Sequence, residues 1–320
     1  MNQMVTAVIL VMVTYFSGYC VPKTVANLKS SILPPLGRVP AAVECTSDNS
    51  KKPENILMRL APEETKKLQD QDEEVKPGLF EGDIAMDEAM YDKWRVGFRW
   101  TNFPDKIWKN GIVSYYISEL YNEASTQLIH GAIEKINYMT CVKLIPWDRQ
   151  TVDYIHIQPV KDPSGCWSHV GRRGGEQVVS LQAPTDYSPG CLASEGTPIH
   201  EIMHALGTFH EQSRWDRDKY IDLHRDNIKP NSLQNFKIQP YHKAFTKYPY
   251  DYNSLMHYGN NFFAVDRSKP TITPKKEGVS VGQREGMSVL DCIKLNDLYG
   301  CFKGHKESYY RRICRTYGVK

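Results

Sequence analysis

Several features are absent from this sequence of 320 residues, and each absence excludes a class of protein. A large excess of one charge is missing, since 40 basic residues stand against 37 acidic ones, so neither a nucleic-acid nor a membrane-surface partner is indicated. No Cys-x-x-Cys pair occurs, which argues against a zinc ribbon or a redox motif. No Asn-x-Ser/Thr sequon occurs either, so glycosylation sites give no support to secretion.

Long apolar runs are also missing, apart from a short one near the amino terminus. Residues 4–16 are uncharged and mostly apolar, but the run is shorter than the roughly 20 residues that span a bilayer. The small residues Ser17, Gly18 and Cys20 follow it, as after the core of a signal peptide. We therefore predict a signal peptide at 1–20, an extracellular location and no stable membrane association. A buried amino-terminal helix is the alternative, because the basic residues that usually precede a signal core are lacking.

The eight cysteines fit disulfides in an oxidising compartment. If signal cleavage follows Cys20 and Cys45 belongs to a removable leader, an even number remains, enough for three bridges. The alternative is that some of them stay reduced and buried. The remaining cysteines are Cys141, Cys166, Cys191, Cys292, Cys301 and Cys314.

Residues 21–99 are interpreted as a propeptide. The stretch 61–77, APEETKKLQDQDEEVKP, is rich in charge and lacks aromatic residues, so we expect a loosely folded leader. A basic cluster follows, in which Arg95 and Arg99 are candidate cleavage sites for an activating trypsin-like protease. An ordinary solvated patch is the alternative for this cluster.

After the basic cluster the pattern becomes that of a folded α+β domain. The predicted strands, rich in β-branched and aromatic residues, are 112–117, 152–158 and 177–182. A helix is predicted from apolar residues at helical spacing between 128 and 139, with Ser125 as its cap. A second helix is predicted at 198–206, and a short helical run at 288–299. Between these two the sequence is irregular and rich in Tyr, Asn and Pro, which indicates a loop-rich lobe.

One segment, which begins at His200, carries most of the functional information. His200 and His204 project from one face of a helix, and Glu201 beside them is a candidate general base. Gly207 lets the chain turn sharply, so that His210 can supply a third nitrogen. Three nitrogen ligands with a position left for water describe one catalytic zinc ion per chain. The alternative is an amphipathic helix with buried core histidines.

Further motifs make the sequence resemble the astacin family of metzincin zinc endopeptidases, from about residue 108 to 301. SLMHY at 254–258 matches a methionine-containing turn, with Met256 beneath the histidines. Glu211 follows the third histidine directly. The other matching blocks are S-R-x-D-R-D at 213–218, GRRGGEQVVSL at 171–181 and GQREGMSVLDCIKLNDLYGC at 282–301.

The resemblance implies a two-lobed catalytic domain at 100–302, with residues 303–320 left as a basic tail. Its first lobe would hold a twisted, mostly parallel sheet with an antiparallel edge strand and two long helices, and its second lobe would be irregular. The family's pairing implies the disulfides Cys141–Cys301 and Cys166–Cys191. Cys292 and Cys314 are then left to pair with each other.

The resemblance also implies roles for single residues. The zinc ligands would be His200, His204 and His210. Tyr258 would be a possible fifth ligand that also stabilises the oxyanion, and Glu201 would be the general base. The strand at 177–181 would be a sheet edge that aligns an extended polypeptide substrate by backbone hydrogen bonds. The alternatives are plain packing for Tyr258 and an interior position for the strand.

A motif in the leader resembles the family's F-x-G-D propeptide motif. LFEGDIAM at 79–86 implies that Asp83 coordinates the zinc and keeps the precursor inactive, whereas a plain acidic turn is the alternative. Removal of the leader would bury a new amino terminus near Glu211, its expected anchor. Extra residues after the basic cluster depart from the family's pattern, so the cleavage position and this anchoring stay open.

The sequence therefore predicts a secreted, monomeric zinc endopeptidase, made as an inactive precursor and acting on extracellular proteins. One alternative is a secreted module that binds zinc without hydrolysing peptides, which the presence of Glu201 opposes. Another is a structural domain held by disulfides, which would contain no zinc. Digestion, hatching, matrix processing and venom action are all compatible with the sequence, so the substrate stays open.

Overall fold

The computed structural model describes residues 78–95, 103–238, 247–304 and 306–320. The predictions for the signal peptide, for residues 21–77 and for Arg99 lie outside these ranges. Within them, no helix combines the length and the apolar character needed to cross a bilayer.

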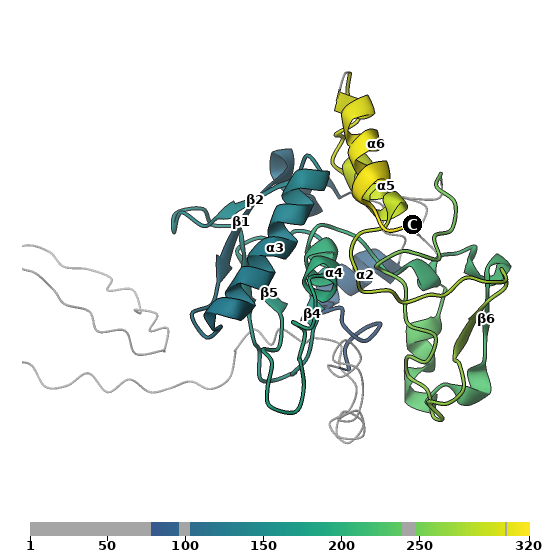
Figure 1. The fold of residues 1–320 in the computed structure, drawn as a ribbon. Helices are drawn as coiled ribbons and strands as arrows, with labels where there is room; N and C mark the ends of the chain where they lie inside the picture. Colours follow the sequence, from purple (N-terminus) through teal and green to yellow (C-terminus); the bar gives the residue numbers. More distant parts are fainter. Residues whose placement is uncertain (1–77, 96–102, 239–246, 305) are drawn as a thin grey trace, which may run out of the picture. The chain divides into compact units, whose positions relative to one another are not determined.

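A five-stranded sheet forms the first part of the domain, in the order β2-β1-β3-β5-β4 (Figure 1). Its strands are β1 Ile112–Ile117, β2 Lys143–Pro146, β3 Tyr154–Gln158, β4 Trp167–Ser168 and β5 Glu176–Ser180. Neighbouring strands run parallel except β4 and β5, which run antiparallel. The predicted α+β class, with a mostly parallel sheet and an antiparallel edge strand, is confirmed.

The edge of this sheet is not where the sequence placed it. β5 lies between β3 and β4, so the prediction of a sheet edge at 177–181 is wrong and the interior position holds. The edges are β2 and β4, and β4, which lies beside β5, has only two residues. Such a short strand gives no alternating pattern that the sequence could show.

Two helices pack next to each other against the sheet (Figure 1). They are α3, Glu123–Met139, and α4, Gly196–Ala205. The side chain of Asn122 accepts a hydrogen bond from the Ser125 amide at 2.9 Å, so Asn122 caps α3 and the prediction of Ser125 as cap is wrong. Two 3-10 turns, η2 Pro104–Lys106 and η3 Lys109–Gly111, precede β1.

Beyond α4 the chain is largely irregular, as predicted. A second hydrophobic cluster holds it together, built around Phe236, Tyr258 and Phe263. Its short elements are η4 Glu211–Ser213, η5 Arg217–Lys219, β6 Ile221–Leu223, η6 Arg225–Asn227, η7 Pro230–Phe236 and β7 Ile272–Pro274. β6 and β7 pair antiparallel in a small sheet of their own.

Two further helices follow the irregular region. α5, Val289–Leu298, begins with a capping box in which Ser288 and Asp291 exchange hydrogen bonds. α6, Lys306–Tyr317, packs against α5, so most of the basic segment predicted at 303–320 forms a helix.

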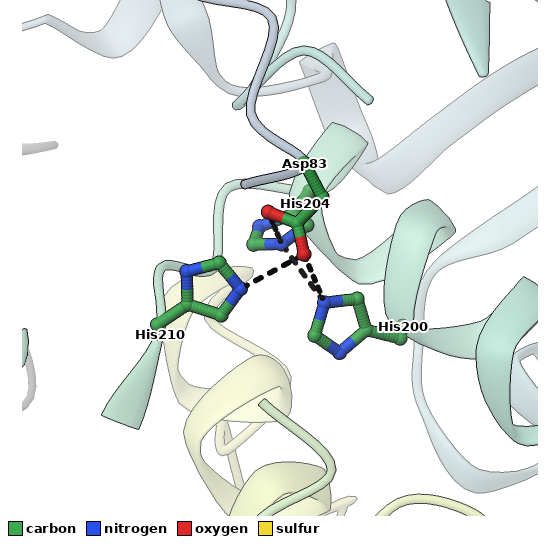
Figure 2. Close-up of side chains that lie close together, drawn as sticks. All are labelled: Asp83, His200, His204 and His210. Carbon is green, nitrogen blue, oxygen red and sulfur yellow. Dashed lines mark hydrogen bonds and ion pairs between the residues drawn. The ribbon is translucent and has the colours of Figure 1, made fainter. Parts of the chain in front are cut away.

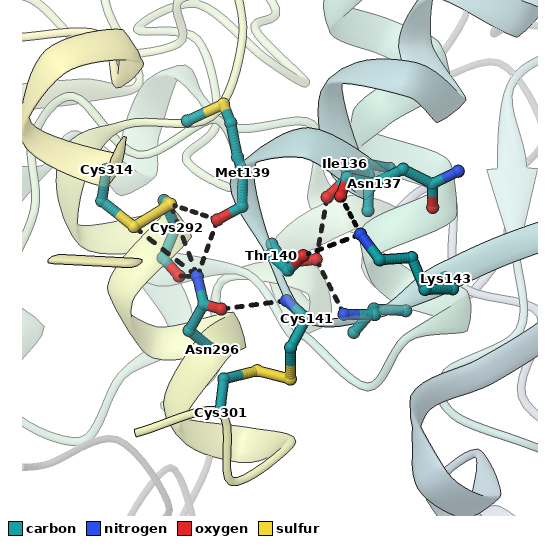
Figure 3. Close-up of a disulfide and its surroundings, with 11 residues drawn as sticks. Ile136, Asn137, Met139, Thr140, Cys141, Lys143, Cys292, Asn296, Cys301 and Cys314 are labelled. Atoms are coloured by element: carbon teal, nitrogen blue, oxygen red, sulfur yellow. Dashed lines mark hydrogen bonds between the residues drawn. A yellow bond between two sulfur atoms is a disulfide. The ribbon is translucent and has the colours of Figure 1, made fainter. Parts of the chain in front are cut away.

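Three disulfides join the described residues. Figure 3 shows Cys292–Cys314, which fastens α6 to α5, close to Cys141–Cys301. Between these two bridges the Asn296 side chain donates a hydrogen bond to the carbonyl of Met139 at 3.0 Å, which ties α5 to the end of α3. The remaining disulfide joins Cys166 and Cys191.

Residues 78–95 pack against the domain, so the expectation of a loosely folded leader is wrong for this stretch. It ends in a helix, α2, Glu88–Arg95. Ahead of α2, Ile84 pairs with Ser168 of β4 in a parallel bridge, so the leader covers the free edge of the sheet. Its apolar side chains are buried against Val170. These side chains are Ile84, Met86 and Met90.

Candidate metal centre

The end of α4 brings three histidines together. His200 and His204 lie one turn apart on the helix, and both are fully buried. Gly207 then adopts a φ of 103°, a conformation that L side chains rarely tolerate, and the chain turns back to place His210 beside the other two. With Asp83 of the leader these residues form a cluster whose ligand atoms lie within 4.8 Å of one another (Figure 2).

Hydrogen bonds fix which nitrogen each imidazole presents to the centre. The Nδ1 atoms each meet an oxygen that can only accept, so each Nδ1 carries the hydrogen and donates. The acceptors are the carbonyls of Leu255 and Thr208, at 2.9 and 2.7 Å from His200 and His204, and the Glu81 carboxylate, at 2.8 Å from His210. All three Nε2 atoms therefore point inward, where each can bind a proton or a metal ion.

These inward atoms fit a bound cation. The Nε2 atoms of His200 and His204 are 3.1 Å apart, too close for two lone pairs unless positive charge lies between them. Oδ2 of Asp83 lies 3.3 Å from the first of these and 3.2 Å from Nε2 of His210, while its Oδ1 is buried without a hydrogen-bond partner. Three imidazole nitrogens and a carboxylate oxygen are the donor set of zinc.

The pKa values of the cluster point the same way. Burial drives the pKa of His204 well below its ordinary value. Burial also opposes charge on His210, but the carboxylates of Asp83 and Glu81 outweigh it and raise the pKa of His210 to about 9. Burial would raise the pKa of Asp83, yet the neighbouring histidines hold it below its usual range. The centre thus keeps positive charge beside Asp83, which a divalent cation would supply.

The other predicted active-site residues surround this centre. Glu201 follows His200 on α4 and is fully buried. Met256 lies buried in the turn at 254–258, whose Leu255 carbonyl orients His200. The Tyr258 ring lies 4.8 Å from the His210 ring, centre to centre, and its hydroxyl donates to the backbone carbonyl of Glu81. The hydroxyl is therefore engaged by the segment at 78–95.

Glu211 lies in a separate buried ion cluster. One of its carboxylate oxygens is 2.7 Å from Nζ of Lys294, and the other is 3.0 Å from Nη1 of Arg214. The second oxygen also accepts from the Asp251 amide at 2.9 Å. Burial raises the pKa of Glu211, but Lys294 and Arg214 more than offset that and lower it. The predicted anchoring of a new amino terminus at Glu211 stays a prediction.

Two residues of these clusters were missed in the sequence. Glu81 stands two places before Asp83, inside the leader motif, so a second acid there was a readable signal. Lys294 is a buried cation on α5, and nothing local distinguishes it from the exposed lysines of the chain.

A helix-borne pair of histidines, a third histidine after a glycine turn and a methionine turn beside them together define a metzincin-type zinc peptidase. The chain belongs to the astacin family, since the model of that family, described as Astacin (Peptidase family M12A), matches residues 100–300. Zinc is the metal of these metalloproteases. The resemblance stated from the motifs is confirmed.

Relatives agree with this assignment. Zinc metalloproteinase nas-14 of Caenorhabditis elegans is 38% identical over 224 residues, covering 69% of this chain and 43% of the relative, so the chain spans less than half of that protein. High choriolytic enzyme 1 of Oryzias latipes is 40% identical over 201 residues, covering 61% of this chain and 70% of the relative. The solved structure of that hatching enzyme zinc-protease matches with a TM-score of 0.54 at 35% identity, covering 61% of this chain and 93% of that one.

Proposed function

We propose that this chain is the inactive precursor of a secreted zinc endopeptidase that hydrolyses peptide bonds in extracellular proteins. The observation that carries the proposal is the convergence of three Nε2 atoms on one carboxylate of a leader segment. The proposed parts are a signal peptide at 1–20, a propeptide at 21–99, a catalytic domain at 100–302 and the basic segment at 303–320. The working form is a monomer.

Bound zinc would supply a Lewis acid that acidifies a water molecule and polarises the peptide carbonyl. Glu201 takes the proton of that water and delivers it to the departing amine. The hydroxyl of Tyr258, once released from the leader, donates a hydrogen bond to the carbonyl oxygen as it gains charge. The edge strand β4 offers its backbone groups to an extended substrate. These groups now pair with the leader, through Ser168 N to Asp83 O at 2.9 Å and Ala85 N to Ser168 O at 2.8 Å.

The same contacts support the proposal that the leader inhibits the enzyme. Asp83 occupies the centre, Glu81 engages both His210 and Tyr258, and the leader fills the edge of β4. A trypsin-like protease would remove it by cutting after Arg95 or Arg99. Arg95 is the last residue of α2. A new amino terminus that reaches Glu211 would meet a carboxylate already held by Lys294 and Arg214.

The test compares the leader-free protein with its Glu201→Ala variant in casein cleavage and in zinc content. We expect one zinc per chain in both forms, and a loss of about 100- to 10,000-fold in cleavage rate in the variant, since the general base is removed. Chelation of the metal should abolish cleavage as well. Zinc without cleavage in the unaltered protein would favour a binding module, and absence of zinc would favour a structural domain. Cleavage that persists in the variant would refute the role of Glu201.

A further inference from the structure

The loop that follows β4 carries two adjacent arginines, and one of them faces the leader. Nε of Arg173 lies 3.2 Å from Oδ2 of Asp87, and both side chains are about one-quarter exposed, at 24% and 26%. The other oxygen of Asp87 accepts from the Met90 amide at 2.8 Å, which fixes the carboxylate at the start of α2. Arg173 therefore forms an ion pair with an acidic side chain four residues after Asp83.

A buried histidine of the domain itself orients Arg173. His169 donates from Nδ1 to the carbonyl of Ala85 at 2.6 Å, so its Nε2 is an acceptor and receives Nη1 of Arg173 at 3.2 Å. Burial, together with the charge of Arg173, lowers the pKa of His169 to about 4, so the ring is neutral at physiological pH. The bond between His169 and Arg173 joins two residues of the domain, whereas the pairs with Ala85 and Asp87 join the domain to the leader.

The neighbouring arginine has a different task. Nε of Arg172 lies 2.7 Å from Oδ2 of Asp153, and its Nη1 donates to the carbonyl of Asp105 at 2.6 Å. The second oxygen of Asp153 accepts from the Gly175 amide at 2.7 Å. Arg172 thus holds the loop to the domain, which makes it the matched control for Arg173.

We infer that Arg173 is a specificity residue, which binds an aspartate or glutamate of the substrate about four positions from the residue at the metal. The inference rests on the proposed function, because it takes the leader as a stand-in for a substrate along β4. When the leader leaves, Asp87 leaves with it, while His169 stays next to the guanidinium at the end of β4. An acidic side chain of the substrate then takes the place of Asp87. Whether the preferred acidic residue lies before or after the cleaved bond shows in which direction the substrate runs along β4.

The first experiment profiles the leader-free protein on a peptide library, and then measures kcat and KM on matched peptides with Glu or Gln at the enriched position. We expect Glu to be preferred by up to about fivefold in kcat/KM, mainly through KM, since the pair is partly exposed. Arg173→Ala should abolish the preference, Arg173→Glu should reverse it, and Arg172→Lys should keep it. An unchanged preference in Arg173→Glu, or no acidic preference in the unaltered protein, overturns the inference. Failure to cleave casein at all would instead refute the proposed function.

A second experiment measures the contact through inhibition. A synthetic peptide of residues 78–95 is added to the leader-free protein as a competitive inhibitor, alone and with Asp87→Arg. The altered peptide should inhibit the unaltered protein several-fold less well, and it should recover its potency against Arg173→Glu. An equal loss of potency against both proteins would contradict a contact between the two side chains.

Discussion

Two buried carboxylates, Asp83 in the leader and Glu211 in the domain, are held in opposite ways. Both are almost completely shielded from solvent, and the pKa of each lies below its usual range. Asp83 faces three imidazoles, which are also the ligands of a metal, and it belongs to a segment proposed to leave. Glu211 faces Lys294, Arg214 and a backbone amide, all fixed parts of the domain.

The difference shows that the role of a buried carboxylate depends on whether another group can satisfy its partners. Zinc and a water molecule would satisfy the imidazoles in place of Asp83, so its loss would be compatible with a working site. Among the described residues no other carboxylate pairs with Lys294, and a buried ammonium without a counter-charge is strongly destabilising, whereas Arg214 also pairs with Asp216. One contact is therefore suited to a switch and the other to permanent structure.

The largest effect on stability should come from the buried ion cluster around Glu211. Glu211→Ala leaves Lys294 buried without its carboxylate, while Arg214 keeps Asp216, and this should lower the free energy of unfolding by about 3–5 kcal/mol. Urea denaturation of the full chain measures this. The double variant Glu211→Ala with Lys294→Met should lose less than the sum of the single variants, because the unpaired ammonium is gone. Additive losses in the free energy of unfolding would show that the ion pair between Glu211 and Lys294 does not stabilise this region.

Loss of the contact between Asp83 and the three histidines should change the activity rather than the folding. In a full chain with Arg95→Gln and Arg99→Gln to prevent cutting, Asp83→Ala should raise casein cleavage by about 100-fold, since a buried charged contact of the leader is lost. The matched control is Glu88→Ala, an exposed acid at the start of α2, which should leave the uncut chain silent. If the Asp83 variant is equally silent, the packing of the leader suffices for inhibition and the comparison with Glu211 fails.

The smallest effect concerns pH and a third acid, Asp251, whose amide binds Glu211. Burial and the nearby charge of Asp291 raise the pKa of Asp251 to about 7, above its ordinary value of 3.8. A raised folded-state pKa favours the protonated form, so this stabilising contribution is full below about pH 4 and is lost as pH rises towards 7. Asp251→Asn should match the parent at low pH and exceed it in stability near pH 8, by on the order of 1–2 kcal/mol. Thermal unfolding of both proteins between about pH 4 and pH 8 checks this prediction. A difference in stability that does not change with pH would contradict it.

Much of the fold was predictable where the signal is local. The β-branched and aromatic residues of IVSYYI placed β1 at its observed bounds, and the apolar spacing before Met139 placed α3. α2 and α6 were missed because EAMYDKWR and KESYYRRICRTY carry few apolar residues in a charged background, so their burial depends on what they dock against. The sheet edge was misassigned because strand order is set by long-range pairing and leaves no mark on the strand itself.

The candidate site likewise contains residues that the sequence predicts and contacts that it does not. His200, Glu201, His204 and His210 lie within one short segment, whose helical spacing and glycine turn are readable from the sequence. Asp83 was named only by a resemblance, since it lies 117 residues from His200. The partnership of Glu211 with Lys294 spans 83 residues and could not be predicted from either side. Contacts of this kind need the fold before they can be recognised.

The apolar side of the leader has a consequence for how the protein is made. Ile84, Met86 and Met90 complete a cluster against Val170, with Phe209 packed at its margin. Burying such a side chain contributes about 1.5–3 kcal/mol, so the precursor should be the sturdier form and the trimmed enzyme the more fragile one. A chain synthesised without residues 78–95 would have to fold with this surface bare. We therefore expect the leader to aid folding as well, so that folding should precede any cut.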